Sequence, residues 1–488
     1  MFDFGLDDTW WLIAVFIFDV SVRIAAVIIV PRNRRPTSAM AWLLAIYFIP
    51  VVGVLLFLLI GTPQLPRQRR RKQRAINEYI EQTARDLDFG TLLPDAPEWF
   101  TSLVTLNRNL GALPLSGNND AHLIADYQES FDAMADAIRS AERYVHVEFY
   151  ILQSDASTEN FFRAMEEATA RGVTVRVLMD HWANRGRPFY RQTCRRLDAM
   201  GAQWHLMLPV QPLRGRYQRP DLRNHRKLVV IDGEVAFMGS QNVIDSTYGS
   251  RKNIRRGLHW VDLMVRLRGP VVGSVNAVFL SDWYSETDEI LSGETEQYDL
   301  PQATGTLDCQ IVPSGPGFEF ENNLRLFLGL LYAAQRRIVL VSPYFVPDES
   351  ILLAITTACH RGVEVTLFVS EEGDQALVYH AQRSYYEALL RAGVKIWMYR
   401  KPYILHTKAF TIDDEVAVIG SSNMDMRSFG LNMEISMLVR GREFVEEVRV
   451  VEEQYRALSR ELTLEEWLKQ PLRSTVLDNL ARLTSALQ

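Results

Sequence analysis

Apolar side chains fall in two long stretches near the N-terminus and in short runs over the rest of the chain. Residues 10–30 and 39–60 are almost continuously apolar, and each has about the 20 residues that a helix needs to cross a bilayer core. Further along, apolar runs of strand length alternate with amphipathic stretches of helical length. The pattern predicts a transmembrane helical hairpin followed by α/β structure with buried strands.

The two apolar stretches differ in their polar content. The first contains Asp19 and Arg23, which lie on one face of a helix, and the second contains Pro50. We expect the two charges to form a local ion pair that faces the partner helix. The first stretch does not have the pattern of a secretion signal, because acidic residues precede it where a signal peptide carries positive charge.

Basic residues follow each apolar stretch. Residues 67–74 carry six positive charges and no acid, which by the positive-inside rule places the rest of the chain on the cytoplasmic side. Residues 31–36 are basic too, although two spans would place them outside. A first stretch that lies at the interface or enters one leaflet would remove this conflict. We favour two spans, and therefore a multi-pass protein with the chain after residue 75 on the cytoplasmic side.

A repeated motif carries most of the chemical information. The pattern His-x-Lys-x4-Asp occurs twice, and no other histidine among the nine has a lysine two positions on. Each copy is followed, at one spacing, by Gly-Ser-x-Asn. The two sets are His225, Lys227, Asp232, Ser240 and Asn242, and His406, Lys408, Asp413, Ser421 and Asn423. A match of several parts that occurs twice indicates an internal repeat.

The residues around each motif predict how its side chains meet. Side chains two positions apart point to one face of a strand, so the histidine and the lysine of each copy should lie together. An apolar run continues the strand, and a second strand then returns the serine and the asparagine to the same edge. Upstream, both halves have a helix that ends at Arg171-Gly172 or Arg361-Gly362 before a strand. We therefore expect βαβ alternation in both halves.

The two motifs with their Gly-Ser-x-Asn segments resemble those of the phospholipase D superfamily. The apolar N-terminus and the stretches Pro313-Ser-Gly-Pro-Gly317 and Ser342-Pro-Tyr-Phe-Val-Pro-Asp348 are similar, more narrowly, to the bacterial cardiolipin synthases of that superfamily, and the likeness covers nearly the whole chain. It implies an α/β fold with two pseudo-symmetric lobes that share one active site. It also implies a place in the bacterial inner membrane and the conversion of two phosphatidylglycerol molecules into cardiolipin and glycerol, through a phosphohistidine intermediate.

We expect four segments along the chain. Residues 1–75 would form the membrane anchor, 76–120 a linker, 121–300 the first lobe, and 301–488 the second lobe with an amphipathic tail. The tail begins near residue 462 and has apolar residues at helical spacing. We interpret it as a helix packed on the second repeat, with contact to a membrane surface as the alternative.

The chemistry of a phosphodiester explains the residue types in the motifs. Negative charge grows on the non-bridging oxygens during displacement, and Lys227 and Lys408 would stabilise it. The neutral donors would bind the same phosphate; they are Asn242, Asn423, Ser240 and Ser421. No metal or other cofactor is then required, and the sequence has no carboxylate or histidine cluster with metal-ligand spacing.

The two histidines must divide the work of the reaction. One imidazole attacks phosphorus and the other protonates the departing oxygen. The residues themselves do not separate these roles, but the resemblance implies His225 as the nucleophile and His406 as the acid, later the base. Each ring needs an acceptor on its second nitrogen. Asp262 and Glu434, which open apolar runs at matching places, are the candidates.

The motif aspartates receive a different interpretation. Asp232 and Asp413 complete the motif that the resemblance associates with catalysis. Five residues along a strand cover about 16 Å, so neither should touch the phosphate that its lysine binds. We interpret both as residues that form a turn or lock a strand.

Other residues near the motifs have two interpretations. Five arginines would either attract anionic headgroups or belong to a solvated loop: Arg214, Arg216, Arg219, Arg223 and Arg226. We expect His181 to be a surface or packed histidine, with reach into the pocket as the alternative. The aromatic residues at two strand ends should pack, with pocket lining as a second role: Phe149, Tyr150, Tyr344 and Phe345. The three cysteines are an odd number without metal or disulfide spacing, which predicts free thiols.

The expected partners are phosphatidylglycerol and the membrane. A net charge of −6 gives no sign of a nucleic-acid surface, and an anchor beside a basic segment suits anionic lipid better than a soluble diester. The rival functions are a phospholipase D hydrolase, a transferase with another acceptor alcohol, a nucleic-acid phosphodiesterase and an inactive scaffold. Two intact motif sets argue against the scaffold. The sequence leaves open the acceptor alcohol, the acyl preference and the oligomeric state.

Overall fold

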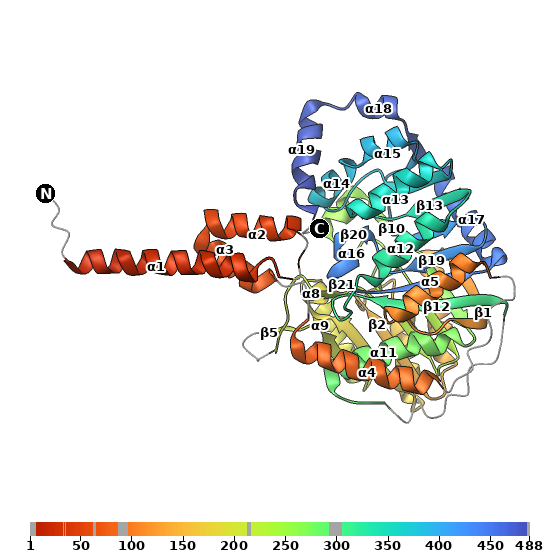
Figure 1. Cartoon of the computed structure of the whole chain (residues 1–488). Helices are drawn as coiled ribbons and strands as arrows, with labels where there is room; N and C mark the ends of the chain where they lie inside the picture. Colours follow the sequence, from red (N-terminus) through yellow and green to blue (C-terminus); the bar gives the residue numbers. More distant parts are fainter. Residues whose placement is uncertain are drawn as a thin grey trace. The chain divides into compact units, whose positions relative to one another are not determined.

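The computed structural model describes residues 6–32, 34, 36–61, 65–85, 96–211, 216–291 and 305–485. The chain divides into two compact units, residues 1–64 and 65–488. The division falls before residue 75, where we expected the anchor to end, because helix α4 (Arg67–Arg85) packs along α11 (Val271–Thr287) in the second unit (Figure 1). Arg69 binds both carboxylate oxygens of Glu286 at 2.7 Å, and Gln73 donates to Ser281 at 2.7 Å.

The first unit contains three apolar helices, α1 (Leu6–Ile29), α2 (Pro36–Phe48) and α3 (Pro50–Ile60). The expected second span is broken, because Ile49 leaves the helical region and Pro50 starts a new helix. With 13 and 11 residues, α2 and α3 are about 20 and 17 Å long, short of the roughly 30 Å core of a bilayer. Within the described residues, one helix is long and apolar enough to cross a membrane, at Trp10–Ile29.

The ion pair expected on the first helix is present. Arg23 Nε lies 2.7 Å from Asp19 Oδ2, and the Arg23 guanidinium lies 5.3 Å from the centre of the Tyr47 ring on α2. The prediction of a local pair that faces a neighbouring helix is therefore confirmed.

A mixed sheet of 16 strands forms the centre of the second unit. From one edge to the other, its strands are β22 (Ser459–Leu462), β16 (Lys395–Tyr399), β15 (Glu364–Ser370), β13 (Arg337–Val341), β18 (Ala409–Ile412), β19 (Val416–Gly420), β21 (Asn432–Arg440), β12 (Leu307–Ser314), β1 (Ser116–Ile124), β11 (Met264–Arg268), β9 (Val235–Gly239), β8 (Lys227–Ile231), β2 (Tyr144–Phe149), β3 (Thr174–Asp180) and β4 (Gln203–Met207), while β7 (Arg223–Asn224) pairs with β21. The strand after each motif histidine has equivalent neighbours, since β8 lies between β2 and β9, and β18 between β13 and β19.

Both faces of this sheet are covered by helices, which explains the continuous apolar runs of the motif strands. On β8, Val229 and Ile231 pack in a cluster with α6 (Tyr127–Arg139) and α7 (Glu159–Ala170), whereas Leu228 and Val230 belong to the cluster on the other face. Helices α12 (Asn322–Ala333) and α13 (Glu349–His360) cover the strands of the second repeat in the same way. The predicted α/β alternation is confirmed.

A cluster common to both repeats holds the unit together. It contains side chains of α11 and of α17 (Arg442–Ala457) together with strands from each half, so the repeats share one core. The remaining helices are α5 (Glu98–Asn109), α8 (His181–Arg185), α9 (Tyr190–Ala199), α10 (Arg251–Arg256), α14 (Ala376–Arg383), α15 (Tyr386–Ala392), α16 (Met426–Gly430), α18 (Leu464–Leu468) and α19 (Leu472–Arg482). Three short strand pairs lie outside the main sheet: β5 (Val210–Gln211) with β6 (Arg216–Tyr217), β10 (His259–Val261) with β17 (Tyr403–Leu405), and β14 (Phe345–Val346) with β20 (Met424–Asp425).

The C-terminal tail packs on the second repeat, as expected. Asp478 of α19 accepts a hydrogen bond from Arg383 Nε at 3.2 Å and lies 2.7 Å from His380 Nδ1, both on α14. The interpretation of the tail as a packed helix is confirmed.

Candidate active site

Two short parallel strand pairs join the motifs of the two repeats. β7 runs beside the start of β21, and the His225 N–H donates to the Met433 carbonyl at 2.8 Å. β10 runs beside β17, and the His406 N–H donates to the Val261 carbonyl at 2.7 Å. The residues that follow Met433 and Val261 are the two predicted orienting acids, so each histidine lies beside the acid of the other repeat.

The histidine and acid side chains are paired across the repeats. His225 Nδ1 lies 2.9 Å from Glu434 Oε2, and His406 Nδ1 lies 2.7 Å from Asp262 Oδ1. Within the described part of the chain, neither Nε2 has a hydrogen-bond partner. A proton held on Nδ1 by a carboxylate leaves a lone pair on Nε2, which is the form of imidazole that can attack phosphorus or remove a proton.

Burial determines the charge of these groups. Loss of hydration lowers the pKa of His225 and of His406 to about 4, despite the neighbouring carboxylates. Burial by itself would raise the pKa of Glu434 and of Asp262, but the adjacent histidine and lysine outweigh it, so both pKa values lie below the ordinary range. At neutral pH the free site therefore holds two neutral imidazoles and two ionised carboxylates.

The motif lysines are held by the backbone of their own histidines. Lys227 Nζ donates to the His225 carbonyl at 2.5 Å, and Lys408 Nζ donates to the His406 carbonyl at 2.5 Å. Burial lowers the pKa of Lys227 to about 8 and also lowers that of Lys408 well below its usual value. Each ammonium has two further protons for a bound oxygen. The histidines precede strands β8 and β18 and do not lie within them, contrary to the expectation of one strand face.

The predicted phosphate contacts of the two serines are corrected by the structure. Ser240 Oγ donates to Asp262 at 2.6 Å, and Ser421 Oγ donates to Glu434 at 2.5 Å. A hydroxyl has a single proton to donate, so both serines hold the orienting acids and have none left for a phosphate.

The two asparagines have different environments. Asn242 Oδ1 accepts from the Ile151 N–H at 3.1 Å, and its Nδ2 donates to the Tyr248 hydroxyl at 2.9 Å, which leaves one amide proton. Asn423 Oδ1 is buried and, within the described residues, has no partner. Asn242 thus retains a donor that the serines have lost, whereas the unpartnered atom of Asn423 is an acceptor.

Asp232 and Asp413 lock strands, as we interpreted them. The Asp232 carboxylate accepts from the backbone N–H groups of residues 142, 143 and 144 at 2.7–2.9 Å. Asp413 accepts from those of residues 335, 336 and 337 at 2.7–3.3 Å. Both residues have a positive φ, 53° and 47°, and each carboxylate binds the backbone at the start of the neighbouring strand, β2 or β13. Their carboxylates therefore hold neighbouring strands together and do not point toward the motif histidines.

The arginine run is not a free basic surface. Arg219 pairs with Asp221, Arg223 Nη1 lies 3.1 Å from the buried Asp180, and Arg226 pairs with the buried Asp282. Arg214 lies outside the described residues, and the side chain of Arg216 does too. The expected attraction of headgroups is thus wrong for Arg219, Arg223 and Arg226. His181 is packed as expected, and its Nδ1 accepts from the Val210 N–H at 3.1 Å.

Three tyrosines surround the imidazoles. The Tyr150 ring centre lies 4.9 Å from that of His225, and those of Tyr248 and Tyr344 lie 6.1 and 6.4 Å from that of His406. Tyr248 was missed by sequence reasoning, although a signal existed. Six residues after each motif asparagine comes an aromatic residue followed by glycine, Tyr248-Gly249 in the first repeat and Phe429-Gly430 in the second. Tyr248 also has a positive φ of 57°, uncommon for a bulky side chain.

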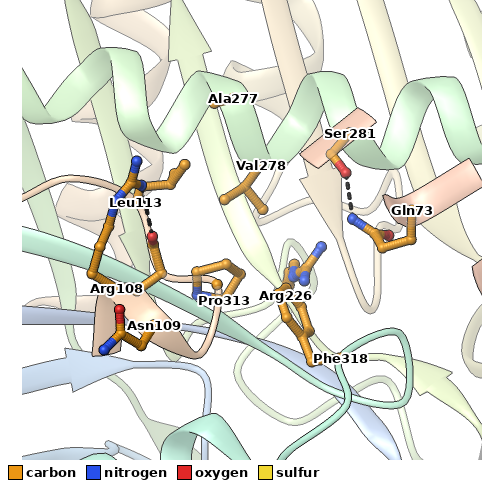
Figure 2. A pocket seen from close by; sticks show the side chains of 12 residues that line it. Gln73, Arg108, Asn109, Leu113, Arg226, Ala277, Val278, Ser281, Pro313 and Phe318 are labelled. Atoms are coloured by element: carbon orange, nitrogen blue, oxygen red, sulfur yellow. Dashed lines mark hydrogen bonds between the residues drawn. The ribbon is translucent and has the colours of Figure 1, made fainter. Parts of the chain in front are cut away.

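Arg226, between His225 and Lys227 in the first motif, binds the strand that carries Glu434. Arg226 Nε donates to the Glu434 carbonyl at 3.0 Å, and Arg226 lines a cavity of about 370 Å³. Figure 2 shows Arg226 beside Phe318 in this cavity, with Val278 and Ser281 of α11 above and Pro313 nearby. The motif histidines and lysines do not line it. Arg226 therefore fixes β21 at the residue whose carboxylate holds His225.

Comparisons with known proteins agree with these motifs. The family model described as "Cardiolipin synthase, PLD-like domain" matches residues 134–257 and 327–455, and "Phospholipase_D-nuclease N-terminal" matches residues 22–61. Cardiolipin synthase A of Proteus mirabilis is 33% identical over 93% of this chain and 94% of its own length. Cardiolipin synthase of Geobacillus kaustophilus is 32% identical over 96% and 92%. In fold, the chain is similar to the crystal structure of phosphatidylserine synthase from Haemophilus influenzae, with a TM-score of 0.58, 15% identity, and coverage of 79% of this chain and all of that one.

Fold, motifs and comparisons define a phosphatidyltransferase of the phospholipase D type. The chain belongs to the cardiolipin synthase family of PLD-like proteins. The predicted family and enzyme class are therefore confirmed.

Proposed function

We propose that the chain makes cardiolipin from two phosphatidylglycerol molecules, in one active site shared by two pseudo-symmetric lobes. The observation that carries this proposal is the crossed pairing of His225 with Glu434 and of His406 with Asp262. Neither repeat has a complete histidine–acid pair of its own. A site that needs both repeats acts on one phosphate at a time, as transfer from a donor lipid to an acceptor lipid requires.

The first half of the reaction forms the phosphoenzyme. His225 Nε2 attacks the phosphorus of one phosphatidylglycerol, a P–N bond forms, and the bond to the glycerol headgroup breaks. His406 gives its Nε2 proton to the departing alkoxide, and free glycerol leaves. Lys227 and Lys408 stabilise the added negative charge on the non-bridging oxygens. His406 is neutral in the free site, so it acquires this proton when the anionic diester binds and raises its pKa.

The second half transfers the phosphatidyl group. His406, now neutral, removes a proton from a headgroup hydroxyl of the second phosphatidylglycerol. That oxygen attacks phosphorus, the P–N bond breaks, and His225 recovers its lone pair as cardiolipin leaves. One phosphodiester replaces another, so no nucleotide is consumed. The assignment of the nucleophile to His225 rests on family resemblance, since the two imidazoles have equivalent surroundings.

A hydrolase that uses water in place of the second lipid is the runner-up. The burial of the site favours transfer, because His225 and His406 are less than a tenth exposed and Lys227 is fully buried. A dry site limits competition from water for the phosphoenzyme. We further propose that the enzyme works at the bacterial inner membrane, with residues 65–488 on the cytoplasmic face. The basic residues 67–74 support this orientation.

The products formed in phosphatidylglycerol vesicles test the proposal. The purified enzyme should release one glycerol per cardiolipin and little phosphatidic acid. His225→Ala and His406→Ala should each abolish cardiolipin formation without unfolding the protein, whereas His122→Ala, at an exposed position on β1, should leave it unchanged. Phosphatidic acid as the main product would establish the hydrolase. A loss of only a fewfold in either motif variant would refute the two-histidine mechanism.

A further inference from the structure

Helices α2 and α3 form a hairpin too short to cross a membrane twice. We propose that α1 alone spans the bilayer, and that α2–α3 enters the leaflet next to residues 31–36 and returns to the same side. The lipid acyl chains of that one leaflet are the partner of the hairpin surface. The chain would then cross the membrane once, and residues 31–36 would lie on the same side as residues 65–488.

Close contacts along the hairpin bring its two ends together. A Cβ added to Gly53 would lie 2.6 Å from the Ala45 carbonyl oxygen, so the helices touch through their backbones near the bend. Farther from the bend, the rings of Trp42 and Phe57 lie 5.5 Å apart. At the open end, the guanidinium of Arg34 lies 4.7 Å from the centre of the Phe57 ring. The chain thus enters and leaves the hairpin at one level (Figure 1).

Contacts with α1 show how deep the hairpin reaches. Ala26 and Val30 at the end of α1 cluster with Ala39 and Ile46 of α2, and Arg23 lies over Tyr47 close to the bend. From there α1 continues for about 20 Å to its apolar start, at 1.5 Å per residue, beyond the reach of α2–α3. The hairpin therefore accompanies only about 10 Å of the spanning helix, which is within the roughly 15 Å of one leaflet.

The surface and charge of the hairpin fit an apolar leaflet. Residues 36–60 contain no charged side chain, and the side chains at the bend are among the most exposed, with Phe48 80% and Val51 73% accessible. Basic residues flank the hairpin on both sides, at 31–36 and 67–74. A re-entrant hairpin places both basic segments on one side and the acidic Asp7 and Asp8 on the other, which satisfies the positive-inside rule where two spans do not.

Labelling of single cysteines with a membrane-impermeant maleimide tests this topology. The background is a full-length enzyme with Cys194 and Cys359 replaced by serine and the fully buried Cys309 retained. In sealed inside-out vesicles, Arg32→Cys and Arg71→Cys should react, and Asp8→Cys should react only after detergent is added. Two spans would instead protect Arg32→Cys. An anchor that lies on one surface would expose Asp8→Cys as well, and either result would overturn the proposal whatever lipid the enzyme makes.

Helix α19 carries a second, independent indication of lipid contact. The side of α19 that faces the protein holds Ala481 and the buried Asp478, which binds His380 and Arg383. Its apolar side faces outward, with Leu472 83% and Leu483 81% exposed. The other exposed apolar side chains of this surface are Val476, Leu477 and Leu480 on α19 and Leu468 on α18. Amphipathic helices of soluble domains usually have the opposite orientation.

We infer that this outward face of α19 rests in the headgroup region of an anionic membrane. The charged residues on its exposed side are Arg473 and Arg482, while its acidic residue, Asp478, is buried. On α19, leucines flanked by cations match a surface of apolar chains under anionic headgroups. The exposed acids of the neighbouring α18, Glu465 and Glu466, are paired with Lys469 and Arg460. The helix would thus give the catalytic unit a membrane contact of its own.

Fluorescence in reconstituted vesicles tests the contact. Val476→Cys, labelled with an environment-sensitive dye in the same cysteine background, should shift to the blue and be quenched by nitroxide lipids in phosphatidylglycerol vesicles. The matched control is Val450→Cys on α17, which is similarly exposed and should not respond. Equal quenching at the two positions would overturn the inference. A different result would be a dye emission that shifts to the blue as the protein concentration rises in detergent and shows no response to lipid. This result would assign the outward face of α19 to contact with a second copy of the chain and would also overturn the inference.

Discussion

Replacement of Glu434 by glutamine would remove one charge from the site and almost nothing else. Glu434 Oε2 accepts from His225 and from Ser421, and Oε1 accepts from the Ser428 hydroxyl at 2.8 Å. A glutamine can keep its oxygen at the first position. Its amide then faces Ser428, whose hydroxyl can turn to accept. The tautomer and position of His225 should therefore survive in Glu434→Gln.

The substitution should slow the reaction at the step where the imidazole of His225 becomes positively charged. Attack on phosphorus places a charge on the His225 ring, close to the carboxylate that it contacts at 2.9 Å. For charge centres about 4 Å apart and an effective dielectric constant of about 20, the lost attraction is about 4 kcal/mol. Since about 1.4 kcal/mol corresponds to a factor of ten in rate, cardiolipin formation should fall about a thousandfold.

The assay is the initial rate of cardiolipin formation in phosphatidylglycerol vesicles, with the thermal midpoint as a check on folding. Glu443→Gln, an exposed position on α17, is the control and should behave as the unmodified enzyme. Adding Ser421→Ala to Glu434→Gln should cause no further loss of rate, because Ser421 acts through the same carboxylate. Adding Ser240→Ala should lower the rate further, because Ser240 acts through Asp262. A rate within tenfold of the unmodified enzyme would refute the role of Glu434 as the charged partner of His225.

Four further outcomes follow from the site. Asp232→Ala should lower the free energy of unfolding by about 3 kcal/mol, because three backbone N–H groups lose a charged acceptor, and urea titration in detergent would measure it; a change below about 1 kcal/mol would contradict the strand-locking role. Sulfate should inhibit more weakly as pH rises, by about tenfold per unit between pH 5 and 7, because an imidazole with a pKa of about 4 must gain a proton when the anion binds; a constant inhibition constant would contradict this. The pKa of both histidines is about 4 in the folded protein, so between about pH 6.5 and 4 the unfolded chain binds protons that the folded chain does not. The thermal midpoint should therefore be highest above about pH 6.5 and fall as the pH is lowered toward 4. A midpoint that does not change over this range would show that the histidines are charged in the folded protein. Exhaustive chelation should leave turnover intact, since Lys227 and Lys408 stabilise the phosphate charge, and a strict need for a divalent ion in the chemical step would contradict this.

Local patterns predicted the motif strands and the residues at their ends. The apolar runs located β8 and β18, and the distance along the strand between lysine and aspartate predicted that Asp232 and Asp413 lie away from the lysine end of the strand. These conclusions depend only on residues that are close together in the chain, and the sequence specifies all of those.

Contacts between residues that are far apart in the chain could not be predicted from the sequence. The arginines of the first motif looked like a free cationic loop because Asp180 and Asp282, which neutralise Arg223 and Arg226, come from other elements. The acids Asp262 and Glu434 could be selected by their matching places, but β7 and β10 pair with the other repeat through two or three residues only, too short a pattern to read. At Pro50 the apolar composition of the segment dominated the expectation, although a proline within a helix removes a hydrogen bond and permits the bend that the structure shows.

The exchange of acids between the repeats affects what a partial chain can do. A fragment that ends after the first repeat contains His225 and Asp262 but lacks Glu434, while a fragment of the second repeat contains His406 without Asp262. An incompletely synthesised or proteolysed protein could thus remain attached to the membrane through α1 and still have no means to cleave the phospholipids around it. Under the proposed mechanism, phosphodiester cleavage requires β21 of the second repeat, because this strand carries the acid that holds His225.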